Sequence, residues 1–157
     1  MENKVSPKYL YDALTSHDIL RSFDLIRTFK AEVKSGFVDV DLAQQYFDSL
    51  IIAYKEPKLS ISSFSTICHL IKLVRIKKPV LLSSLHSILI PFLLQRLKES
   101  RTSLRSASMK ALVTIWEAAP REFENDLKTI GLKSRDPLIR RRLLEMIEEI
   151  SKNSPGF

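Results

Sequence analysis

Hydrophobic residues recur at spacings of three and four positions along almost the whole chain, which is the pattern of amphipathic α-helices. Ser6 followed by Pro7 is a typical helix start, and Gly36 is a typical helix end. Further breaks are expected at Pro57 and Pro120. The second helix is expected to be capped by Ser16 or Asp18, the third to start at Asp39 or Asp41, and the fourth at Ser60 or Ser62. The fifth is expected over about 80–98, the sixth between Ser103 and Pro120, the seventh over about 121–130 with its stop at Gly131, and the last from Pro137 through Ile150. The pattern therefore predicts an all-α protein of eight helices in four pairs.

The second helices of these pairs share an internal repeat. Counted from Ser22, Ser63, Leu104 and Ile139, apolar residues recur at offsets drawn from 4, 7, 8 and 11 positions, and these origins lie 41, 41 and 35 residues apart. HEAT repeats have roughly this period. Because one pair cannot cover its own apolar face, successive pairs must stack. We therefore predict an α-solenoid of about four HEAT-like pairs.

The helical spacing also predicts which side chains face inward. The expected inward residues of the second, third and fourth helices are Phe23, Ile26, Phe29, Val33, Leu42, Tyr46, Leu50, Tyr54, Ile67, Leu70, Ile71 and Val74. Ser103 is expected to cap the sixth helix, and Pro91 should remove one hydrogen bond from the fifth. We expect a single domain over 1–153 and a frayed tail over 154–157.

The segment Asp136-Pro137-Leu138-Ile139-Arg140 has the D-P-x-V-R form that begins the second helix of a HEAT pair. Asp136 or Ser134 is expected to cap this helix, with Pro137 at its first position. Arg140 is expected to bridge to the next pair. Leu104 and Arg105 repeat the same apolar-arginine step in the third pair.

Charge is concentrated in the middle of the chain. The whole chain has a formal net charge of +7, whereas residues 57–116 hold ten basic residues and one acid, a net charge of +9. A basic centre favours an acidic partner. Apolar stretches are too short to span a bilayer, so no membrane partner is predicted.

No constellation for catalysis, cofactor binding or metal binding is visible, so we predict a non-enzymatic protein. His17, His69 and His86 lack metal-site spacing, and Cys68 has no second cysteine as a partner. Cys68 and His69 are neighbours on a helix, so their side chains point about 100° apart and do not form a nucleophile and base. A single cysteine is weakly typical of the cytosol or nucleus.

The turns within the pairs should emerge on one edge of a solenoid. They contain Lys58, Arg101, Lys133 and Arg135, which would form a basic ridge suited to an acidic protein. A nucleic-acid partner is disfavoured, because few aromatic residues interleave with the basic ones for base stacking.

Four segments of the chain resemble the first TOG-like domain of the CLASP family of microtubule-associated proteins, above all its fungal members. They are Leu25–Lys34 (LIRTFKAEVK), Gln45–Leu50 (QYFDSL), Ile67–Arg75 (ICHLIKLVR) and Leu132–Ile150 (LKSRDPLIRRRLLEMIEEI). The resemblance implies a paddle that presents its turns to tubulin, in proteins that stabilise microtubules in the cytoplasm, on the cytoskeleton and spindle, and at kinetochores.

Carried over by position, the resemblance places the usual first-turn Trp at Ile19, and the later turns contribute Lys58, Arg101, Lys133 and Arg135. Two departures are plain: Ile19 is not Trp, and about four pairs are present where a full TOG domain has six. Two partner hypotheses follow. One is tubulin or microtubules, and the other is a different protein, such as a spindle or kinetochore component, held by a HEAT-repeat adaptor.

Overall fold

The computed structural model describes residues 5–153, and every regular element in that part of the chain is a helix. The chain divides into two compact units, Met1–Leu81 and Leu82–Phe157. Each unit holds two helix pairs, which confirms the predicted all-α, solenoid-like class. One domain over 1–153 stays a prediction, and the expected frayed tail at 154–157 lies outside the described residues.

The first unit contains α1 (Pro7–Leu14), α2 (Ile19–Ser35), the 3₁₀ turn η1 (Val40–Leu42), α3 (Ala43–Tyr54) and α4 (Ser60–Lys77). Predicted caps are confirmed: Ser6 Oγ accepts a hydrogen bond from the N–H of Tyr9 and Asp18 Oδ1 from that of Arg21, both at 3.1 Å. Gly36 ends α2 with φ +78°, a left-handed conformation that glycine adopts without strain.

The core of the first unit forms where α4 packs on α2 and α3. The four inward residues predicted for α4, from Ile67 to Val74, are fully buried. Phe29 of α2 and Tyr46 of α3 stack with ring centroids 4.4 Å apart, and Tyr46 Oη donates to the carbonyl of Val5 at 2.7 Å. This bond ties the segment before α1 to α3.

Three predicted inward positions are less buried than expected. Phe23 is 40% exposed, because Ser22 takes the inward place and its Oγ donates to the Ala13 carbonyl at 3.0 Å. Leu42 and Tyr54 are half-buried, since they lie at the two ends of α3.

The second unit contains most of α5 (Leu81–Arg96), then α6 (Thr102–Ala118), α7 (Pro120–Asp126), the π-turn η2 (Leu127–Gly131) and α8 (Pro137–Asn153). Pro91 lies inside α5 as predicted. Ser103 is not a cap: α6 begins one residue earlier, with Arg101 at the N-cap position and no side-chain bond there. His86 Nδ1 of α5 lies 2.6 Å from the buried Asp126 Oδ2 of α7 and links the two pairs of this unit.

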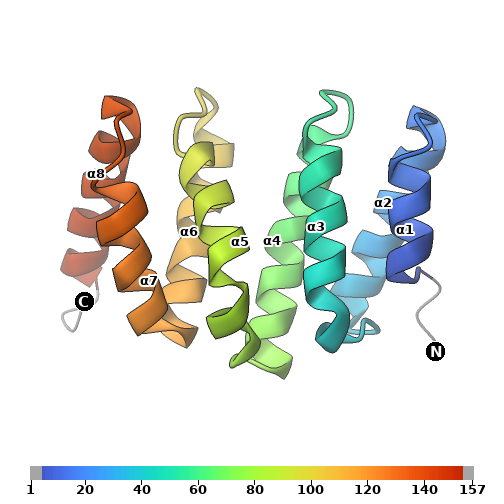
Figure 1. The fold of residues 1–157 in the computed structure, drawn as a ribbon, viewed down its shortest axis with the longest axis horizontal. Coiled ribbons are helices and arrows are strands. Elements are labelled where there is room, and N and C mark those ends of the chain that lie inside the picture. The colour runs from blue at the N-terminus through green and yellow to red at the C-terminus, as the bar shows by residue number, and fades with distance from the viewer. Residues whose placement is uncertain (1–4, 154–157) are drawn as a thin grey trace. The chain divides into compact units, whose positions relative to one another are not determined.

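In each unit the two turns that join the helices of a pair lie at the same end of the helices (Figure 1). In the first unit these are the α1–α2 and α3–α4 turns, and in the second the α5–α6 and η2–α8 turns. The shared edge predicted for the turns is therefore present within each unit.

Gly131 ends η2, as the sequence predicts, but the π-turn before it was not foreseen. Gly131 is buried against Leu143 of α8, and a Cβ added there would lie 2.4 Å from Leu143 Cδ2. Close packing of the turn on α8 therefore requires glycine at this position.

We predict that Gly131→Ala destabilises the chain by about 1–3 kcal/mol, because Leu143 is fully buried and must leave its packed position. Urea unfolding of the variant beside the unaltered chain measures the change. Gly131→Ala with Leu143→Ala is the control, since removal of the clashing methyl groups should make the two effects less than additive. An unchanged free energy of unfolding in Gly131→Ala would contradict the packing argument.

Candidate protein-binding surface

The two turns of the second unit are joined by an ion pair. Lys98 Nζ, in the α5–α6 turn, lies 2.7 Å from Asp136 Oδ2, in the η2–α8 turn. Asp136 Oδ1 also accepts from the N–H of Leu138 at 3.0 Å, so this carboxylate caps α8 as predicted. The hydrogen bond from Lys98 and those from the backbone lower the pKa of Asp136. Asp136 is therefore ionised at neutral pH and holds both turns at once.

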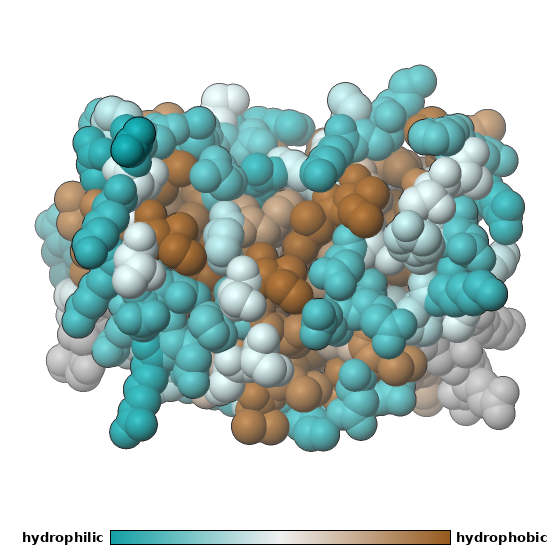
Figure 2. All heavy atoms as spheres, viewed as in Figure 1, coloured by the Kyte–Doolittle hydropathy of each residue, from teal (hydrophilic) through white to brown (hydrophobic). Residues whose placement is uncertain are grey.

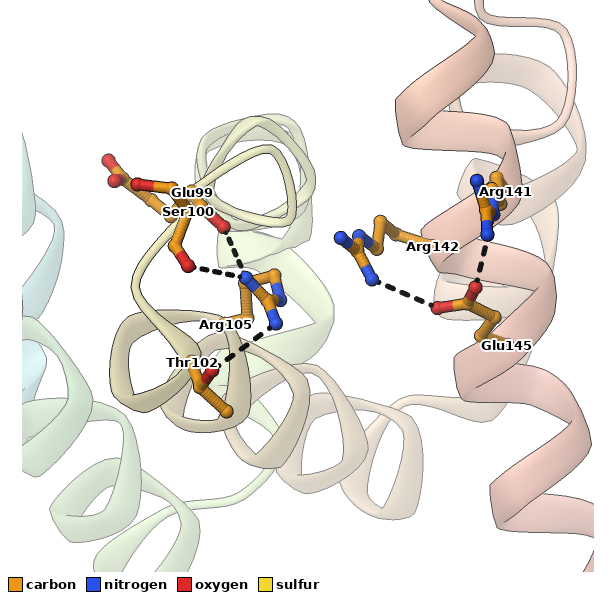
Figure 3. A network of polar contacts seen from close by, with 7 residues as sticks. All are labelled: Glu99, Ser100, Thr102, Arg105, Arg141, Arg142 and Glu145. Carbon is orange, nitrogen blue, oxygen red and sulfur yellow. Dashed lines mark hydrogen bonds and ion pairs between the residues drawn. The ribbon is translucent and has the colours of Figure 1, made fainter.

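Two arginines fix the backbone of the same turns. The Arg105 guanidinium donates to the carbonyls of Glu99 and Ser100, both at 2.8 Å (Figure 3). Arg140 donates in the same way to the carbonyl of Ser134. Each arginine lies one residue after a repeat origin, Leu104 or Ile139. Equivalent positions of two pairs therefore both donate hydrogen bonds to the carbonyls of the preceding turn. The expected bridge from Arg140 to the next pair stays a prediction, and the bond that the structure shows is to a carbonyl of its own turn.

The basic residues predicted for these turns remain at the surface. Arg101, Lys133 and Arg135 are exposed, and none forms an ion pair within the part of the chain that the structure describes. We call these three residues the second-unit turn surface. Farther along α8, Arg141 and Arg142 differ from them, since both pair with Glu145, at 3.4 and 3.3 Å (Figure 3). The turn surface therefore presents uncompensated positive charge on an immobilised backbone.

The turn end of the first unit has a different character. Ile19 is only partly exposed and packs with Leu14 against the core cluster of Ile26, Ala53 and Leu59. The next residue, Leu20, is 80% exposed at the start of α2. Ile61, at the equivalent position of α4, is 56% exposed.

Two exposed aliphatic side chains, Leu20 and Ile61, thus lie at the same end of the first unit as Lys58, which is also exposed (Figure 1). The structure places Lys58 where the sequence predicted it, in the turn between α3 and α4. Ile19 is half-buried against the core cluster, and its role as a contact residue stays a prediction.

The expectation of one ridge through Lys58, Arg101, Lys133 and Arg135 spans both units and stays a prediction. Sequence reasoning missed Leu20, Lys98 and the turn-binding role of the two arginines. The repeat register contained a signal for most of these residues, because Leu20 matches Ile61 and Arg105 matches Arg140.

Side chains that could bind a metal ion or act as a nucleophile also lie outside the turns. No group of three or more metal-ligating side chains occurs among residues 5–153. Burial raises the pKa of the Cys68 thiol to about 11, so it is protonated and a poor nucleophile at neutral pH. No helix in the described part of the chain is long and apolar enough to cross a membrane.

Hydrophilic side chains cover most of the rim of the face drawn in Figure 2, and hydrophobic ones reach the surface in patches between them.

Comparison with known proteins gives three fungal relatives. Protein STU1 of Debaryomyces hansenii is 29% identical over 137 residues, which cover 84% of this chain and 9% of the relative. Protein STU1 of Yarrowia lipolytica is 28% identical over 149 residues, covering 92% of this chain and 9% of the relative. Protein stu1 of Aspergillus fumigatus is 26% identical over 137 residues, covering 84% and 10%.

The chain is related to the fungal CLASP-type proteins. It spans about a tenth of the length of the relatives it matches. No family model and no solved structure matches it.

We predict that Arg105→Ala loosens the α5–α6 turn and lowers the free energy of unfolding by about 1–3 kcal/mol, because two carbonyls lose a charged donor. Hydrogen exchange of the amides of residues 97–102 should speed up. Arg141→Ala is the control, since that exposed side chain only joins a surface ion pair. Equal effects of the two substitutions would show that Arg105 does not hold the turn.

Proposed function

We propose that this chain is a CLASP-type, TOG-like module that binds tubulin or microtubules through the turn ends of its helix pairs and promotes microtubule stabilisation. The observation that carries the proposal is the second-unit turn surface, where Arg101, Lys133 and Arg135 lie exposed on turns held by Lys98, Asp136, Arg105 and Arg140. Relatives of the CLASP type support the microtubule as the structure to which it binds.

Immobile turns matter because a flexible basic loop loses conformational entropy when it binds. Here the backbone hydrogen bonds of Arg105 and Arg140 are formed before a partner arrives. An acidic protein surface would meet three cations whose anchoring backbone is already ordered. We expect such a protein to act in the cytoplasm on the cytoskeleton and spindle, and in the nucleus where the spindle forms there.

We predict that Arg101→Glu with Lys133→Glu weakens co-sedimentation with microtubules by about tenfold at low salt, since attraction becomes repulsion at two contacts. Added salt should weaken binding of the unaltered chain in the same direction. Arg121→Glu is the matched control: it is also exposed, lies in the second unit and starts α7, away from the turns. Affinity unchanged by the double reversal would remove this surface from the interface.

A non-tubulin protein of the spindle or kinetochore is the second candidate partner. Ile19 favours it, because the position that corresponds to the usual Trp is packed on the core and offers no exposed anchor. Binding to such a partner through Leu20 and Ile61 would tolerate salt, since apolar contacts are not screened.

We predict that Ile19→Ala lowers the free energy of unfolding by about 1–3 kcal/mol, whereas Leu20→Ala changes it by less than about 0.5 kcal/mol. The reason is that Ile19 packs on the core and Leu20 is surrounded by solvent. Urea unfolding separates the two. If Leu20→Ala also weakens capture of a protein from mitotic extract at unchanged stability, Leu20 is a contact residue; a loss of stability in Leu20→Ala would contradict its exposed placement.

A further inference from the structure

A basic face distinct from the turns lies on the first unit, where α2 and α4 pack together. Arg27, Lys30 and Lys34 follow one stripe of α2 at helical spacing, and His69 and Lys72 follow one stripe of α4. We call these five residues the α2–α4 basic face. Phe23, 40% exposed, continues the stripe of α2, and Ile76, 79% exposed, continues that of α4.

The two stripes face the same space. Partial burial lowers the pKa of His69, and the positive charges of Lys34, Lys72 and Lys30 lower it further. Lysines of α2 therefore lie close enough to α4 to be felt by its histidine. At neutral pH the ring is uncharged and leaves the lysines as the cations of this face.

Acidic residues do not offset this charge. The sequence of α4 contains no Asp or Glu. Of the two acids of α2, Glu32 lies on the other side of the helix from Arg27, Lys30 and Lys34, and Asp24 lies three residues before Arg27, at the Phe23 end of the stripe. Within the described part of the chain, Lys30, Lys34 and Lys72 form no ion pair or hydrogen bond.

The lysines at the end of α4 differ from Lys30, Lys34 and Lys72, because they have partners within the first unit. Lys77 donates to the carbonyls of Gly36 and Val38, and Lys78 pairs with Asp41 at 2.9 Å. Those two cations hold the α2–α3 loop in place. The cations of the α2–α4 basic face have no such structural task, and their mutual repulsion lowers stability.

We propose that the α2–α4 basic face binds an acidic peptide segment of a partner protein. Charge complementarity selects an acid-rich occupant, because a cluster of unpaired lysines gains most from carboxylates that neutralise it. The stripe from Phe23 to Lys34 extends about 16 Å along α2, the length of about five residues of extended chain. Base stacking needs several aromatic rings interleaved with the cations, whereas the exposed rings Phe23 and Phe37 precede and follow the run from Arg27 to Lys34, so the geometry favours peptide over nucleic acid.

The probe is a synthetic peptide of six consecutive glutamates, with a six-glutamine peptide as the neutral reference. Fluorescence anisotropy with the 157-residue chain at low salt should show binding of the glutamate peptide only, and added salt should weaken it. Lys34→Glu with Lys72→Glu should weaken it about tenfold. Both lysines are exposed, so folding should survive, and circular dichroism checks this. Lys34→Gln with Lys72→Gln, which removes charge without reversing it, should give a smaller loss.

Arg101→Glu with Lys133→Glu is the matched control, because it changes the net charge equally but lies on the turn surface. It should leave binding of the glutamate peptide unchanged. This control also separates the two proposals: loss of microtubule binding in one double variant and of peptide binding in the other would show two independent surfaces.

The titration of His69 locates the site. A bound carboxylate should raise the pKa of His69 toward its ordinary value, which proton NMR measures with and without the peptide. Three results would overturn the proposal: equal loss in the two glutamate double variants, an unmoved His69 titration at saturating peptide, or a single-stranded oligonucleotide that binds this face more tightly than the peptide.

Discussion

Burial of the apolar side of the second helix in each pair is the constraint on which the rest of the structure depends. In α4 that side is completely closed off from solvent, because α2 and α3 both pack against it. A single amphipathic pair would leave much of this apolar side exposed to solvent, so each unit needs two pairs to form a core. The ends of the helices share less in this burial, so the exposed positions of the turns can carry charged or apolar side chains without a cost to the core.

The sequence predicts the helices well where short-range chemistry decides the outcome. Ser6, Asp18, Gly36 and Asp136 act within three residues of their own position, so their capping roles are visible without tertiary information. Helical spacing likewise finds the buried side of α4. It fails for Phe23, because an inward hydrogen bond makes Ser22 the better core residue, and a hydropathy pattern does not contain that bond.

Candidate binding residues are harder to predict, because a side chain has several competing partners within reach. Arg140 was expected to bridge to the next pair, and the structure shows it bonded to a carbonyl of its own turn. Ile19 was expected at a contact position, but the core takes it and leaves Leu20 outside. The positions of Lys58, Arg101, Lys133 and Arg135 in turns were predictable, since charged loop residues have little to bury. Which cations would be immobilised by backbone carbonyls was not.

The basic residues of this chain fall into two groups, according to whether another group of the chain compensates their charge. Arg105, Arg140 and Lys77 donate hydrogen bonds to backbone carbonyls, and these bonds compensate much of their positive charge. Those residues stabilise turns and loops and have little charge left for a partner. Lys30, Lys34 and Lys72 form no ion pair within the described residues, and their charges act, after burial, to lower the pKa of His69. Placing like charges close together without a compensating acid costs free energy, and binding of an anion at this face would reduce that cost. The same reasoning applies to Arg101, Lys133 and Arg135, whose backbone is fixed while their side chains remain unpaired. Both proposed binding surfaces therefore consist of cations that the fold positions but does not neutralise.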